Sequence, residues 1–167
     1  RKKVSANHTS THLLHDALKK VMGKGVRQAG SYVSDDRLRF DFVSFENMSL
    51  DQLHETERIV QEAILSKRPV TVREMELEEA LKTDAVALFT EKYEDRVRII
   101  SIEGYSSEVC GGTHVANTSD IFLFRITGFS SIGKNLKRIE AVTYREAIGS
   151  FDSCRETLHG LGSMLET

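Results

Sequence analysis

The sequence of 167 residues lacks several features that would each define a class of protein. No run of apolar residues approaches the ~20 that a membrane-spanning helix needs. Its two cysteines, Cys110 and Cys154, are too few for a disulfide framework. No secretory signal pattern precedes the first motif. We therefore expect a cytoplasmic protein.

The chain also lacks an excess of positive charge. Its 23 Lys and Arg residues are balanced by 25 Asp and Glu residues, for a net charge of −2. It is therefore not a broadly basic nucleic-acid binder, and any RNA contact must use a local patch or a neighbouring domain. The length suits one domain with a real core. Because the chain begins Arg1-Lys2-Lys3 without methionine, we expect it to be part of something longer.

Two stretches far apart in the sequence carry metal-ligand side chains. In the first, His8 and His12 are four residues apart, so on a helix they share one face with their Cβ atoms about 5–6 Å apart. Asn7 is the expected N-cap and Gly23 the expected end of this helix. Apolar residues recur between them with helical period, namely Leu13, Leu14, Ala17, Leu18 and Val21.

The second stretch is Cys110-Gly111-Gly112-Thr113-His114, where two glycines permit a tight turn that brings both ligands to one centre. Imidazoles and a thiolate suit zinc, whereas calcium and magnesium prefer oxygen. Either motif alone is weak evidence, and the histidine pair alone would be surface residues. Together they predict a zinc site formed by His8, His12, Cys110 and His114. His15 is expected to pack or to face water.

The remaining pattern predicts an α+β fold, with an antiparallel-rich sheet, helices packed on one side, and the zinc site between the N-terminal helix and the Gly-Gly turn. Residues 38–42 alternate apolar and polar, as in a strand with one buried face. Ser49 and Gln52 form a capping box for a helix that must end before Pro69. Further strands are expected at residues 26–33, 70–72, 97–102 and 136–143.

Three expectations concern the C-terminal third. Residues 121–126 are apolar on both faces, which predicts a central strand. The polar stretch 130–135 predicts a flexible loop. Helical character after Arg145 is expected to be broken by glycines. We expect residues 1–147 to form one domain and residues 148–167 to be a helical segment leading out of it.

At five motifs the chain resembles the editing domain of alanyl-tRNA synthetase. The same core occurs in free-standing alanyl-tRNA editing proteins and, more distantly, in threonyl-tRNA synthetase, which usually lacks the Cys-Gly-Gly-Thr-His form. The resemblance covers residues 4–147, although Ser10 replaces an alanine and Ser119 and Tyr144 replace glycines of the family pattern. The motifs are residues 8–15, 28–31, 39–42, 110–114 and 138–143.

The resemblance implies zinc-dependent hydrolysis of serine or glycine from tRNA for alanine, within an ATP-binding alanine–tRNA ligase. A pocket that accepts alanine cannot strongly reject glycine or serine, because one methylene provides only ~1–3 kcal/mol of discrimination between amino acids. Such errors call for a separate editing site. By the same resemblance Thr11 and Gln28 line the amino-acid pocket. The alternative for Thr11 is a helix residue whose hydroxyl bonds to the backbone of its own helix. The alternative for Gln28 is a strand residue that faces solvent.

Several basic residues are candidates for contact with the tRNA end, and a solvated basic edge is the alternative for all of them. They are Lys134, Lys137 and Arg138, with Arg1, Lys2 and Lys3. The zinc could activate water or anchor the substrate. Two other functions stay open: a tRNA-binding module with a purely structural zinc, and a zinc hydrolase of this fold acting on another ester.

Overall fold

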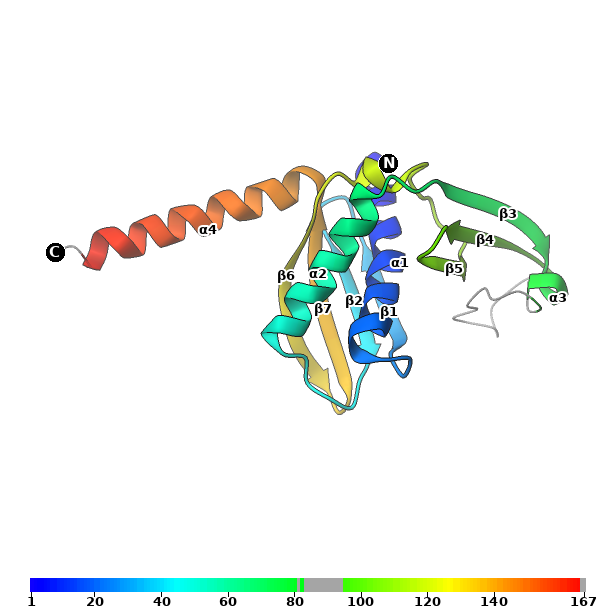
Figure 1. The fold of residues 1–167 in the computed structure, drawn as a ribbon, viewed down its shortest axis with the longest axis horizontal. Coiled ribbons are helices and arrows are strands. Elements are labelled where there is room, and N and C mark those ends of the chain that lie inside the picture. Colours follow the sequence, from blue (N-terminus) through cyan, green and yellow to red (C-terminus); the bar gives the residue numbers. More distant parts are fainter. Residues whose placement is uncertain (81, 83–94, 166–167) are drawn as a thin grey trace.

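The computed structural model describes residues 1–80, 82 and 95–165, which form an α+β fold with two antiparallel sheets (Figure 1). This confirms the predicted fold class. In chain order the elements are α1 (Lys2–Met22), β1 (Arg27–Val33), β2 (Leu38–Val43), α2 (Leu50–Leu65), β3 (Val70–Glu76), α3 (Leu77–Ala80), β4 (Arg96–Ile102), β5 (Ser106–Val109), the 3₁₀ helix η2 (Thr118–Ile121), β6 (Phe124–Gly133), β7 (Leu136–Thr143) and α4 (Tyr144–Leu165).

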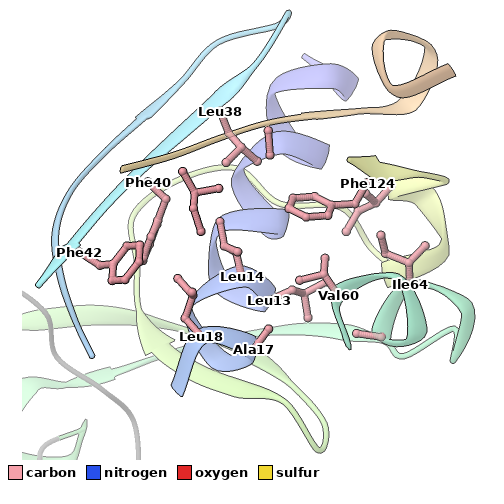
Figure 2. Close-up of a cluster of buried hydrophobic side chains, with 14 of the residues drawn as sticks. Leu13, Leu14, Ala17, Leu18, Leu38, Phe40, Phe42, Val60, Ile64 and Phe124 are labelled. Carbon is pink, nitrogen blue, oxygen red and sulfur yellow. The ribbon is translucent and has the colours of Figure 1, made fainter. Parts of the chain in front are cut away.

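The main sheet has the strand order β1-β2-β7-β6, and α1 and α2 pack against it. Figure 2 shows Phe40 and Phe42 of β2 pointing toward Leu14 and Leu18 of α1. The predicted alternation of β2 is confirmed, because its apolar residues are buried and the residues between them are partly exposed. Burial of this helix face against the sheet therefore holds α1 in place.

A second, smaller sheet of β3, β4 and β5 has its own apolar cluster. Figure 1 shows it beside α1, on the opposite side of the molecule from α4. The sequence pattern predicts a single sheet, because it does not reveal which sheet each strand joins, and the structure has two. β5 ends at Val109, so this sheet brings the residues that follow it toward α1.

The start of α1 differs from the prediction. The helix begins at Lys2, and Asn7 is buried inside it rather than at its N-cap. Tertiary partners satisfy the Asn7 side chain, because its Nδ2 donates to the Ser34 carbonyl at 3.0 Å and its Oδ1 accepts from Thr143 Oγ1 at 2.7 Å. The end of α1 at Gly23, with φ of 93°, is confirmed.

The expected central strand at 121–126 is wrong. Ile121 is buried at the end of η2, Phe122 is an exposed residue with φ of 70°, and β6 begins only at Phe124. β6 lies at the edge of the main sheet. The apolar stretch therefore spans the end of η2, which buries Ile121, and the start of β6, which buries Phe124.

The expected loop at 130–135 is also wrong in most of its length. Residues 130–133 belong to β6, where Ser130 pairs with Arg138 and Ser131 with Lys137. In α4, Gly149 and Gly160 do not interrupt the helix, which continues to Leu165. Figure 1 shows α4 projecting from the sheets.

Other local predictions are confirmed. Ser49 and Gln52 form the capping box of α2, which ends before Pro69. The pairing of β1 with β2 shifts register between Gln28 and Gly30, which marks a bulge or irregularity in β1. Within residues 1–80, 82 and 95–165, no helix combines the length and the apolar character that crossing a membrane requires.

Candidate metal centre

α1 supplies two imidazoles from consecutive turns of one face. The ring centroids of His8 and His12 are 5.5 Å apart. The other face of the helix is buried through Leu13, Leu14 and Leu18, so the helix cannot rotate about its axis without exposing core residues. The core packing thereby aims both histidines toward the small sheet.

The residues after β5 supply the thiol and a third imidazole. The Cys110 amide donates to the Arg98 carbonyl at 2.9 Å, which extends the β4–β5 pairing by one residue. The Arg98 guanidinium in turn donates to the carbonyls of Gly111 at 2.9 Å and Gly112 at 3.2 Å. β4 therefore holds the first three residues of this segment, Cys110 to Gly112.

Position 112 has room only for glycine. A β-carbon added at this position would lie 1.9 Å from Cε1 and 2.3 Å from Nδ1 of His8. Such distances are far inside van der Waals contact, so any larger residue would push the His8 ring away or displace the segment. Gly111 has open space beside it. The second glycine of the motif thus allows close approach of backbone and imidazole.

The structure brings His8, His12, Cys110 and His114 together, with one ligand atom from each lying within 4.8 Å of the others. Cys110 Sγ lies 3.4 Å from Nε2 of His8 and 3.4 Å from Nε2 of His114. Tetrahedral zinc with ordinary bond lengths places sulfur and nitrogen about 3.5 Å apart. The donor set and its spacing therefore fit a zinc ion, and this group could hold a metal.

The site favours a cation electrostatically. Burial alone would raise the pKa of the Cys110 thiol, but its polar contacts with the His114, His12 and His8 imidazoles outweigh burial and lower the pKa to about 3. Burial alone would lower the pKa of His12, but the adjacent Cys110 and Glu108 outweigh it and raise the pKa to about 9. The thiolate is the form that binds metals, and a metal ion would take the place of the His12 proton.

Glu108 lies behind the cluster and was not among the site residues predicted from the sequence. Its two carboxylate oxygens lie 2.7 Å from Nδ1 of His12 and 2.9 Å from Nδ1 of His15. All three side chains are at most 5% exposed. A carboxylate on Nδ1 leaves Nε2 of a metal-ligating histidine free to bind the ion. Glu108 is two residues before Cys110, on the same side of an extended chain, a signal that could have identified it.

His15 packs as expected, with a ring contact to Phe40 besides its bond to Glu108. Burial alone would raise the pKa of Glu108, but the bonds to His12 and His15 outweigh it and lower the pKa to about 2. The carboxylate is therefore ionised in the folded protein. Its negative charge faces the His12 imidazole, whose pKa it helps to raise, from inside the core.

Thr9 orients the third histidine and was also missed. Its hydroxyl donates to the Ser5 carbonyl at 2.9 Å, accepts from the Val115 amide at 3.2 Å, and lies 3.1 Å from Nδ1 of His114. A hydroxyl has one proton to donate. Because Ser5 takes that proton, Nδ1 of His114 must be the donor to Thr9, and Nε2 is left unprotonated toward Cys110.

The two residues expected to line an amino-acid pocket have local bonds. The Thr11 hydroxyl donates to the His8 carbonyl at 2.7 Å, one turn back in the helix. Gln28 is half-buried on β1, an edge strand, and donates to the Ser31 hydroxyl at 3.3 Å. Both arrangements match the alternatives named from the sequence, and a pocket role for either stays a prediction.

The basic residues near the β6–β7 turn lie apart from α1's N-terminus, since Figure 1 shows the turn at the opposite end of the main sheet. Lys134 is in the turn and exposed. Lys137 is buried and bonded to Asn47 and Ser131, while Arg138 forms a bidentate ion pair with Asp41 at 2.8 Å. Contact of these residues with RNA stays a prediction.

Comparison with known proteins agrees with the motifs. Residues 97–140 match the family described as "Threonyl and Alanyl tRNA synthetase second additional domain". The alanine–tRNA ligase of Petrotoga mobilis is 46% identical over 167 residues, the whole of this chain and 19% of that enzyme. The alanine–tRNA ligase of Thermotoga petrophila is 53% identical over 143 residues, 86% of this chain and 17% of that enzyme.

A third relative, the alanine–tRNA ligase of a Thermoanaerobacter species, is 46% identical over 166 residues, 99% of this chain. The chain spans about a fifth of the length of these relatives, 19% of the first. The match to the Petrotoga mobilis enzyme covers the whole chain, and with it both segments that form the metal cluster. The chain is therefore related to the editing domain of alanyl-tRNA synthetase.

Proposed function

We propose that this chain hydrolyses the ester between serine or glycine and the terminal ribose of tRNA for alanine, with zinc as its cofactor. The observation that carries the proposal is the convergence of His8, His12, Cys110 and His114 from two distant segments. A hydrolytic role explains why such a cluster is partly open to solvent, since Cys110 and His114 are only half-buried.

The side chains of the site would have three roles: binding the metal, orienting its ligands and binding the amino acid. His8, His12, Cys110 and His114 would hold the zinc ion, which supplies a Lewis-acidic centre for ester hydrolysis when bound. Glu108 and Thr9 set the tautomers of His12 and His114. Thr11 and Gln28 would read the amino acid, because a hydroxyl and an amide can each both donate to and accept from the hydroxyl of serine.

The proposal extends to the surroundings of the domain. Residues 1–147 would form the editing domain, and residues 148–167 would lead toward the rest of an alanine–tRNA ligase. The relatives' length, five times that of the aligned region, supports this arrangement. The location would be cytoplasmic, where aminoacyl-tRNA is made. Lys134, Lys137 and Arg138 are retained as candidate tRNA contacts.

The test is hydrolysis of seryl-, glycyl- and alanyl-tRNA for alanine by the zinc-loaded chain, with the Cys110→Ala variant alongside. Cys154→Ala is the matched control, because Cys154 is an exposed cysteine on α4. We expect fast loss of the seryl or glycyl ester, sparing of the alanyl ester, and loss of activity only in Cys110→Ala. A folded, zinc-loaded chain without activity, both alone and within the full ligase, would refute the proposal and favour a structural zinc.

A further inference from the structure

His15 is a buried polar side chain to which the proposed function gives no role. It lies on the same face of α1 as His8 and His12, since the three residues are spaced i, i+4 and i+7 along the helix. The ligand atoms that converge on the metal position do not include it. Only 1% of its surface is exposed, so it cannot contact a substrate.

Core packing alone does not explain an imidazole at this position. The His15 ring contacts the Phe40 ring, with centroids 5.6 Å apart. Its Nε2 is buried and has no hydrogen-bonding partner among residues 1–80, 82 and 95–165. A buried nitrogen without a partner lowers stability, and a phenyl ring would fill a similar space without that cost. The group that an apolar ring could not supply is the other nitrogen, Nδ1.

Nδ1 of His15 holds one oxygen of the Glu108 carboxylate. The two atoms are 2.9 Å apart, with the geometry of a hydrogen bond. An ionised carboxylate can only accept, so Nδ1 of His15 carries the proton. The other carboxylate oxygen lies 2.7 Å from Nδ1 of His12, a shorter contact that is off the line of the ring N–H. The better directed bond, from His15, therefore fixes the rotation of the carboxylate.

The orientation of Glu108 matters for the metal ligand on its other side. If the carboxylate rotated, its second oxygen would leave Nδ1 of His12, and this imidazole would lose the partner that keeps its other nitrogen turned toward the cluster. The side chains of Glu108, His12 and His15 are at most 5% exposed, so water cannot replace a lost donor. Such partners behind a ligating histidine fix the orientation of its ring.

We infer that His15 is a positioning residue of the metal centre: its Nδ1–H orients Glu108, and Glu108 in turn orients His12 for metal binding. The inference deepens the proposed function and rests on it for the identity of the metal and of the reaction. His15 contacts neither the metal nor the substrate. Its influence passes through one carboxylate and one imidazole, on β5 and α1, which lie against each other (Figure 1).

Two substitutions separate the ring of His15 from its donor. His15→Phe keeps an aromatic ring and removes Nδ1, whereas His15→Asn removes the ring and keeps a nitrogen donor equally far from the backbone. His15→Phe should weaken zinc binding about tenfold in competition with a chelator, and His15→Asn should stay within about threefold of the parent. His54→Phe is the matched control, because His54 is exposed on α2, and it should leave zinc affinity unchanged.

A second measurement needs no variant to fold. In the ¹⁵N NMR spectrum of the parent protein, the His15 ring should be protonated at Nδ1. The ring resonances of His12 should then move in His15→Phe and stay closer to their parent positions in His15→Asn. A His15 ring protonated only at Nε2 would overturn the inference, and so would a zinc affinity that follows the ring instead of the donor.

The two proposals fail separately. Weaker zinc binding in His15→Phe, together with no ester hydrolysis by the zinc-loaded parent either alone or within the full ligase, would support the positioning role and refute the proposed function. Ester hydrolysis by the parent, together with unchanged zinc affinity in His15→Phe, would support the proposed function and refute the positioning role.

Discussion

The buried carboxylate of Glu108 offers the most direct test of how the cluster is organised. Replacing it by glutamine keeps the shape of the side chain and removes its charge. The amide oxygen can still accept from one Nδ1–H, but the amide nitrogen must then face the other Nδ1 as a donor. Either His12 or His15 must therefore change tautomer, and a changed His12 would carry a proton on the nitrogen that faces the metal.

The structure sets the expected magnitude. Glu108 and both histidines are at most 5% exposed, so water cannot replace the lost interaction. Loss of such a carboxylate behind a ligating histidine weakens metal binding by about 10–100-fold. At about 1.4 kcal/mol for each factor of ten, this corresponds to roughly 1.4–2.8 kcal/mol. Folding stability should fall as well, because hydrogen bonds to a charged group contribute about 1.5–3 kcal/mol each.

The assay is zinc affinity measured by competition with a chromophoric chelator, together with the thermal midpoint of the metal-free protein. Glu103→Gln is the control, because Glu103 is 77% exposed and its ion pair with Arg68 is long, at 3.9 Å. We expect the control to match the parent in both measurements. Zinc affinity of Glu108→Gln within twofold of the parent, in a folded protein, would refute the argument that the carboxylate behind His12 supports metal binding.

Three further predictions test the space, orientation and packing behind the site. Gly112→Ala should abolish the visible spectrum of bound cobalt, used as a zinc substitute, because the new methyl group overlaps an imidazole, whereas Gly111→Ala should retain the spectrum. Thr9→Val should shift the ¹⁵N resonances of the imidazole it contacts and weaken zinc binding about tenfold; unchanged resonances would contradict its orienting role. Leu14 is fully buried, so Leu14→Ala should lower the free energy of unfolding by about 2–5 kcal/mol. Leu50 is 73% exposed, so Leu50→Ala should change the free energy of unfolding far less in the same denaturant titration.

Local patterns were sufficient where neighbouring residues decide the structure. The spacing of His8 and His12, the end of α1 at Gly23 and the capping box at Ser49 and Gln52 each depend on a few adjacent residues. The alternation of β2 predicted its buried face for the same reason. The convergence of the two ligand motifs was expected from the types of their side chains, and the geometry agrees with that expectation.

Tertiary structure decided what depends on partners distant in the chain. Asn7 has a cap-forming side chain, yet its bonds to Ser34 and Thr143 place it inside a helix. The apolar run at 121–126 contains no sign that one residue enters the core from η2 and the next turns outward. Glu108 acquires its role only because β5 lies against α1, where His12 and His15 each contact one of its two oxygens. A local pattern specifies the conformation of a segment, whereas a buried polar side chain is specified by whichever partner the fold brings within hydrogen-bonding distance.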